Sequence, residues 1–196
     1  MQPAQSTATR TAYAALNRAL VVLRLNGVFS PPVRAQPITK EPVMPVATTP
    51  AGYHSVTPYL TIKGVAGALE FYKKAFSAVE VMRMDMGPGV IGHAEIKIGD
   101  SHVMMSDEFP DMGALSPQTL GGSPGFLMIY TPDCDALIAQ AVAAGAKVTR
   151  AAEDQFYGDR SGQVEDPFGH RWGIATHIED VSDEEIQRRL AAMGSH

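Results

Sequence analysis

The sequence predicts an α+β fold in which two tandem β-α-β-β-β modules form a curved mixed sheet with a concave cleft. Segments rich in β-branched residues recur along the chain, and each group of them contains one segment with helical spacing. The pattern then restarts halfway along the folded part. Phe76 and Gly145 stand at the two helix-to-strand junctions, and Thr57 and Phe126 stand in the two opening strands at the same separation. This shared separation indicates a duplicated module.

The first module is expected over about residues 56–110. Its helix, Val65–Phe76, places Leu69, Tyr72 and Phe76 on one side. Gly99 and Asp100 are typical of a hairpin turn between the last two strands. The expected strands are Val56–Ile62, Val79–Met86, Val90–Ile98 and His102–Asp107, followed by a loop over Pro110–Ser123.

The second module is expected over about residues 123–177. Asp135 is the expected N-cap of a helix over Ala136–Ala144, and Gly145 suits the position after its end. Gly158–Gly162 is expected to be a turn region, and Asp166–Gly169 to be a hairpin turn. The expected strands are Gly125–Thr131, Lys147–Ala151, Gln163–Asp166 and Arg171–Thr176.

Two segments lie outside the modules. Residues 1–50 contain no acidic residue before Glu41 and several prolines after Ser30, which indicates a disordered or targeting-like extension. An organelle transit peptide and a secretion signal compete here with a third interpretation, in which the segment is a disordered tail or Met44 is the true start, and we favour this third interpretation. Residues 182–193 form a predicted C-terminal helix whose Ile186, Leu190 and Met193 are expected to pack on the domain or on a second subunit.

Composition narrows the classes of partner. The net charge of −5 and a pI of about 5.6 lack the basic footprint of a nucleic-acid-binding protein. The apolar runs are much shorter than the ~20 residues of a membrane-spanning helix. Cys134 is the single cysteine, so the sequence indicates a reducing cytoplasm and no internal disulfide. A sheet covered by a helix on one face leaves its other face for a second module or a ligand, which predicts a small-molecule site.

Several segments together resemble the vicinal oxygen chelate superfamily, which includes glyoxalase I, bleomycin-resistance proteins and extradiol dioxygenases. The similarity extends over about residues 53–180, and the branch that it resembles most is the bacterial PhnB-like one. The resemblance implies a homodimer that binds a small molecule, while the charge and the short apolar runs predict neither nucleic acid nor a membrane as a partner. The segments that carry it are VTPYL at 56–60, LEFYKKAF at 69–76, GHAE at 92–95, DQFYGDRSG at 154–162 and EDPFGHRW at 165–172.

The same resemblance places the superfamily's four metal-ligand positions at Thr57, Glu95, Phe126 and Gly173. Glu95 alone has a side chain that binds divalent metals, whereas a catalytic zinc usually has three protein ligands. The standard site is therefore expected not to be intact. The cofactor stays open, and a divalent metal on Glu95 is disfavoured.

His93 lies two residues before Glu95, so both side chains should project from the same face of one strand. Such a pair could act as acid and base or hold a metal, and a hydrogen-bonded couple that only shapes the wall is favoured over both. Alternation along the strands predicts the rest of the lining. The expected lining residues are Thr57, Tyr59, Thr61, Phe126, Met128, Tyr130, Gly173 and Ala175.

A second polar cluster, Gln155, Tyr157, Asp159 and Arg160, lies between Gly158 and Gly162 or beside them. Tyr157 and Arg160 are candidate ligand contacts, although an Arg–Asp ion pair that braces the loop is the favoured interpretation. His102 and His170 are expected to be solvated or capped, and Trp172 to anchor the core.

Three functions are compatible with this pattern. The first is a binding protein without chemistry, holding a cationic or aromatic ligand. The second is a metal-dependent lyase or dioxygenase of the glyoxalase type that uses Glu95 and His93. The third is a metal-independent isomerase or epimerase with the same two residues as acid and base.

Overall fold

The computed structural model describes residues 46–193, so the predicted N-terminal extension lies almost wholly outside the described residues. Module 1 contains β1 (Tyr59–Ile62), α2 (Val65–Phe76), β2 (Val79–Gly87), β3 (Val90–Ile98) and β4 (Ser101–Asp107). A connecting segment then holds the short helices η2 (Pro110–Met112) and α3 (Pro117–Leu120). Module 2 contains β5 (Phe126–Tyr130), α4 (Cys134–Ala144), β6 (Lys147–Asp154), β7 (Asp159–Glu165) and β8 (Arg171–His177), and α5 (Asp183–Met193) follows.

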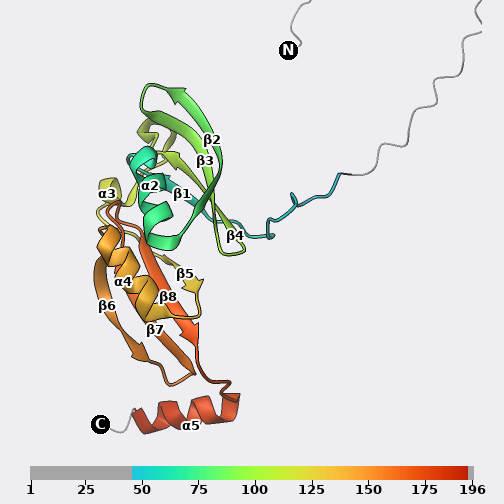
Figure 1. The fold of residues 1–196 in the computed structure, drawn as a ribbon, viewed down its shortest axis with the longest axis vertical. Helices are drawn as coiled ribbons and strands as arrows, with labels where there is room; N and C mark the ends of the chain where they lie inside the picture. Colours follow the sequence, from blue (N-terminus) through green and yellow to red (C-terminus); the bar gives the residue numbers. More distant parts are fainter. Residues whose placement is uncertain (1–45, 194–196) are drawn as a thin grey trace, which may run out of the picture. The chain divides into compact units, whose positions relative to one another are not determined.

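Each module forms its own four-stranded mixed sheet, with the orders β1-β4-β3-β2 and β5-β8-β7-β6 (Figure 1). The opening strand is parallel to the last strand of its module, and the remaining pairs are antiparallel. The identical topology confirms the α+β class and the duplicated β-α-β-β-β module. The strands pair within each module, so two open sheets stand where one curved sheet was expected.

Three local expectations need correction. Strand β1 begins at Tyr59, because Thr57 lies in the preceding turn and bonds to the His54 carbonyl. Asp133, and not Asp135, caps α4, since its carboxylate accepts the N–H of Ala136 at 2.9 Å. The region of Gly158–Gly162 is mostly strand, because β7 starts at Asp159.

The core lies between the helices and one face of each sheet. Figure 1 shows α2 and α4 on the same side of the two sheets, one after the other, and the two helices contact each other. Ala94 and Ile96 on β3 are fully buried on the helix side of the first sheet, because side chains alternate between the two faces of a strand. Trp172 is buried and packs against Tyr72 and Phe76, which confirms it as a core anchor. The opposite face of each sheet is open.

A buried carboxylate joins the two modules. Asp166, in the turn between β7 and β8, accepts hydrogen bonds from the Tyr72 hydroxyl of module 1 at 2.7 Å and from Trp172 Nε1 at 3.0 Å. Its other oxygen accepts the backbone N–H groups of Phe168 and His170, both at 2.9 Å. Four donors therefore converge on one side chain at the boundary between the modules.

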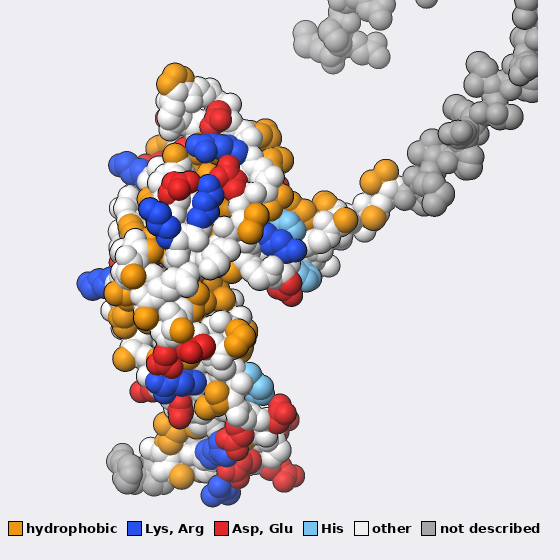
Figure 2. All heavy atoms as spheres, viewed as in Figure 1, with side chains coloured by type: hydrophobic (Ala, Val, Ile, Leu, Met, Phe, Trp, Pro, Cys, Tyr) orange, Lys and Arg blue, Asp and Glu red, His pale blue; other side chains and the backbone are white. Residues whose placement is uncertain are grey.

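Helix α5 is held by charge more than by its apolar stripe. Leu190 and Met193 are 47% and 61% exposed, so within the described residues the expected packing of the stripe on the domain is weak. Arg189 forms a two-pronged ion pair with Glu179 and also bonds to the carbonyl of Phe156. Figure 2 shows acidic and basic side chains gathered over this helix. Packing of the stripe on a second subunit stays a prediction.

No helix in the part of the chain that the structure describes is long and apolar enough to span a membrane. The cytoplasmic location stays a prediction.

Candidate functional site

A chain of hydrogen bonds crosses the open face of the first sheet and joins two of the predicted site residues. His93 Nε2 lies 2.9 Å from Glu95 Oε1, and His93 Nδ1 lies 3.0 Å from the hydroxyl of Tyr59. The hydroxyl of Tyr53 donates to the other Glu95 oxygen. The order along the chain is therefore Tyr59, His93, Glu95, Tyr53.

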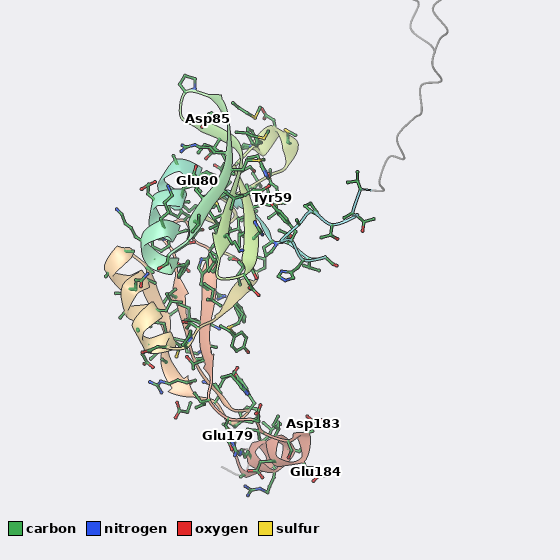
Figure 3. The ribbon with its side chains drawn as sticks, turned by 45° about the vertical axis from the view of Figure 1, so that its right-hand side comes forward. Tyr59, Glu80, Asp85, Glu179, Asp183 and Glu184 are labelled. Atoms are coloured by element: carbon green, nitrogen blue, oxygen red, sulfur yellow. The ribbon has the colours of Figure 1, made fainter. Side chains whose placement is uncertain are left out.

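The proton positions along this chain follow from the donors and acceptors. A carboxylate can only accept, so Nε2 of His93 carries the hydrogen that faces Glu95. In the neutral ring, Nδ1 is then an acceptor and Tyr59 donates to it. Tyr59 is 52% exposed and Glu95 only 6%, so the chain runs from a buried acid to a phenol at the surface. Figure 3 shows Tyr59 on the side of the first sheet away from α2.

The electrostatics of the chain keep Glu95 ionised. Burial by itself would raise the pKa of Glu95, but the hydrogen bonds from Tyr53 and His93 outweigh it and leave that pKa below its ordinary value. The hydrogen bond to Glu95 raises the pKa of Tyr53, with burial adding to the rise. Glu95 is therefore an acceptor at neutral pH and not a proton donor.

Sequence reasoning missed Tyr53, which lies before the first strand and follows no strand or helix periodicity. It is placed by stacking on His102, with ring centroids 4.0 Å apart and planes 14° apart. His102 Nδ1 lies 2.9 Å from the carbonyl of Gly52. His102 is thus buried and capped by a backbone carbonyl, which is one of the two states expected for it. The presence of Tyr53 itself was the one sequence feature that could have indicated its stacking on His102.

The four metal positions implied by the resemblance do not assemble around Glu95. Thr57 is in a turn and bonds to the backbone, while Phe126 and Gly173 belong to the second sheet. Within residues 46–193, no group of three or more His, Cys, Asp or Glu side chains is arranged to hold a metal ion. Glu95 and His93 are two residues of the kinds that bind divalent metals, but the other groups in this hydrogen-bonded chain are the phenols of Tyr53 and Tyr59, so the third protein ligand of a usual catalytic site is missing from it.

The open face of the second sheet carries the predicted aromatic and methionine lining. Phe126, Met128 and Tyr130 are 51%, 42% and 63% exposed and alternate along β5 with residues that pack on the core. Gly173 lies beneath two of them, since a methyl group there would come within 2.9 Å of the Met128 sulfur and 3.1 Å of the Phe126 ring. The glycine therefore provides the space in which these two side chains rest.

A second acid–imidazole–phenol cluster lies on this face and was not predicted. The Tyr130 hydroxyl donates to Asp159 Oδ2 at 2.9 Å, and His177 Nδ1 lies 2.8 Å from Asp159 Oδ1. His177 Nε2 lies 3.0 Å from Asp180. Hydrogen bonds to Asp180 and then Asp159 raise the pKa of His177, and the bond to Asp159 raises that of Tyr130. The spacing of His177 and Asp180 was the only sequence signal for this cluster.

Arg160 braces the structure, as the favoured interpretation held, but with other partners than Asp159. Its guanidinium holds Asp135 through two hydrogen bonds of 2.6 and 2.9 Å and Asp154 at 2.9 Å. Tyr157 packs edge-on against Phe156. Within the described residues, no hydrogen bond or ion pair connects Arg160 or Tyr157 with the Glu95 chain. A ligand contact by either residue stays a prediction.

Comparisons with known proteins bear on both the fold and the site. The family model of the Glyoxalase/Bleomycin resistance protein/Dioxygenase superfamily matches residues 52–174. A Mycobacterium bovis protein is 38% identical over 143 residues, which cover 71% of this chain and 94% of that protein. A solved Arabidopsis thaliana structure shares 28% identity at a TM-score of 0.52, covering 62% of this chain and 98% of its own.

Two further solved structures are similar to this chain. TioX from Micromonospora is 22% identical at a TM-score of 0.50, covering 63% of this chain and 98% of its own. A Bacillus cereus PhnB protein is among the structural neighbours at 16% identity and a TM-score of 0.49, covering 63% and 99%. These two likenesses concern the fold alone.

Proposed function

Since the chain belongs to the glyoxalase/bleomycin resistance protein/dioxygenase superfamily, we propose that it binds a small molecule on the open face of its first sheet. The observation that carries this is the hydrogen-bonded chain that ends at Tyr59. It places a half-exposed phenol on a sheet face, oriented by a partly buried imidazole and a buried carboxylate. Buried polar groups that orient one exposed group are typical of a recognition site.

Charge indicates the kind of ligand. Glu95 is ionised and buried, and its partners among the described residues are a phenol and an imidazole, with no Lys or Arg. The whole chain is also acidic, with a net charge of −5. A cationic aromatic ligand would stack on Tyr59 and supply the missing positive charge.

A metal-independent acid–base reaction is the second candidate, because the hydrogen bonds from Tyr59 to His93 and from His93 to Glu95 all donate in the same direction. His93 is placed to take the Tyr59 proton, and Glu95 is placed to stabilise the imidazolium that results. Tyr59 would then act on a carbon acid, as in an isomerase or epimerase. The metal-dependent lyase or dioxygenase is the third candidate, and it needs ligands that the described residues do not bring to Glu95.

We also propose a homodimer. Large apolar side chains are exposed on β2 of the first sheet and on β5 of the second, among them Met82, Met84, Phe126 and Met128. Extended apolar surface of this kind usually marks an interface. Light scattering coupled to gel filtration tests this proposal, and a monomer at all concentrations would contradict it.

The binding proposal is tested with benzamidine as a cationic aromatic probe. Isothermal titration should show binding to the unaltered protein and a loss of at least about tenfold in Glu95→Gln, because the buried charge is removed. Glu153→Gln, on β6 and well exposed, is the matched control and should bind normally. Equal binding by both variants would contradict the role given to Glu95.

The competing functions separate in two further measurements. Deuterium incorporation from D₂O into small carbonyl compounds, lost in Tyr59→Phe, would favour the acid–base enzyme over the binding protein. Stoichiometric Ni, Zn, Mn or Fe in gently purified protein, lost in Glu95→Gln, would favour the metal enzyme. Neither result is expected if the protein only binds its ligand.

A further inference from the structure

A small cavity with a wide opening to solvent lies between β1 and the segment that connects the modules. Its volume is about 220 Å³. An apolar cavity of about 150 Å³ is large enough to bind benzene, so this one suits a single-ring molecule and is small for a drug-sized one. The walls that line it are Tyr59, Leu60, Thr61, Leu115, Pro117, Leu120, Gly122, Ser123, Pro124 and His170.

The outer wall of the cavity is held in place from both modules. Glu108 accepts hydrogen bonds from the Ser116 N–H at 3.1 Å and from the Thr119 hydroxyl at 2.7 Å, which fixes the start of α3. Gln118 donates to the carbonyl of Pro167 at 2.9 Å, in the turn of module 2. A wall fixed in this way preserves the space without a ligand.

His170 is one of the polar residues that line this cavity, beside Tyr59, Thr61 and Ser123, and one of its ring nitrogens has no hydrogen-bond partner among the described residues. Nε2 lies 3.2 Å from the carbonyl of Thr61, and because a carbonyl only accepts, Nε2 carries the hydrogen. Burial lowers the pKa of His170, more than the nearby Asp166 and the bond to Thr61 raise it, so the ring is neutral at pH 7. Nδ1 is then an acceptor, and no residue within 46–193 donates to it.

Nδ1 is also accessible. Among the described residues, Nε of Arg150 is the side-chain nitrogen or oxygen that is fully buried and has no hydrogen-bond partner. Nδ1 of His170 has no partner either, so it is not fully buried. The His170 side chain lines the cavity while the residue is only 7% exposed. An acceptor that is not fully enclosed therefore belongs to a residue that lines a largely apolar space.

We propose that this cavity binds a small phenol, with the ring among Leu115, Leu120 and Pro124 and the hydroxyl donating to Nδ1 of His170. The occupant is neutral, because Lys, Arg, Asp and Glu are missing from its lining. This site goes beyond the proposed function, since it is built without Glu95 and has Tyr59 alone in common with that chain. A phenol bound here would lie beside the ligand proposed for Tyr59.

The test compares 4-fluorophenol with fluorobenzene by ¹⁹F NMR on the full chain at pH 7.5. Both should bind, and the phenol should bind about 2- to 10-fold more tightly, the range that one neutral hydrogen bond provides. Leu115→Trp should abolish binding of both probes by filling the cavity. Met112→Trp is the matched control on the same segment, because Met112 is 82% exposed and lies outside the lining.

His170→Phe should remove the preference for the phenol and retain fluorobenzene. Should this variant not fold, the probe pair and the Leu115→Trp variant still decide the matter. The proposal is overturned if neither probe binds, if the two bind equally, or if Leu115→Trp binds both as well as Met112→Trp does. The two proposals are distinguished by their variants, because Leu115 and His170 lie outside the Glu95 chain and Glu95 lies outside the cavity lining.

Discussion

The two modules share one topology, yet the groups on their open faces are ordered differently. In module 1 the imidazole of His93 stands between Tyr59 and Glu95, whereas in module 2 the carboxylate of Asp159 stands between Tyr130 and His177. In module 1 the exposed end of the hydrogen-bonded chain is the phenol of Tyr59, which donates to the imidazole of His93. The exposed end of the second is a histidine between two carboxylates. The first order can move a proton to and from the surface, and the second holds a positive charge in place.

The modules differ also in what they give to the joint between them. Module 2 supplies Asp166 and His170, which bind the Tyr72 hydroxyl and the Thr61 carbonyl of module 1. Module 1 contains the hydrogen-bonded chain from Tyr53 through Glu95 and His93 to the exposed Tyr59. The duplicated modules therefore differ in their contacts, with the Tyr59–His93–Glu95 chain in the first and the joining carboxylate in the second.

The largest effect is expected at the joint. Asp166→Asn replaces one carboxylate oxygen by an NH₂ group, which cannot accept a hydrogen bond. The two buried donors that bind that oxygen then lose their acceptor. We expect the free energy of unfolding to fall by about 2–5 kcal/mol, measured by urea denaturation. Asp183→Asn, at the exposed start of α5 (Figure 3), should change it by less than about 0.5 kcal/mol. A loss of less than about 1 kcal/mol for Asp166→Asn would show that this carboxylate does not join the modules.

A smaller effect should distinguish the sheets themselves. A methyl group on Gly162 of β7 would lie 2.8 Å from Ile138 Cδ1 and 3.0 Å from the Arg150 carbonyl, which is backbone and cannot move freely. Gly162→Ala should therefore destabilise by about 1–3 kcal/mol. Gly92→Ala on β3 meets only the flexible and 70% exposed Met86, so we expect less than about 0.5 kcal/mol. Thermal unfolding followed by circular dichroism measures both, and equal losses would contradict the difference.

The smallest effect concerns the charge held by module 2. The pKa of His177 is raised by Asp180 and Asp159, so its protonated form stabilises the folded state. This contribution is complete below the ordinary histidine pKa of about 6.5 and is lost as the pH rises through the raised value. NMR titration of the His177 ring should show a lower pKa in Asp180→Asn, with Asp183→Asn as the control. An unchanged His177 pKa would mean that Asp180 does not hold it.

Much of the fold was predictable because it depends on local patterns. The helix Val65–Phe76 and the strand Val90–Ile98 were predicted with the bounds that the structure has, since each has a clear period and a turn signal at its end. The start of β1 was misjudged because Val56–Thr57 has strand-like residues but no partner strand. The start of β7 was misjudged because the two glycines near it look like a turn, although Gly162 lies in the strand where Ile138 packs.

The sequence by itself determined the module, its duplication and the placement of His93 and Glu95 on one face, because strand alternation fixes which side chains share a face. Only the tertiary structure decided the partners. Tyr53 reaches Glu95 across 42 positions, Tyr72 reaches Asp166 across 94, and His170 reaches Thr61 across 109. Contacts between such distant residues depend on how the modules pack, and no local period in the sequence records that packing.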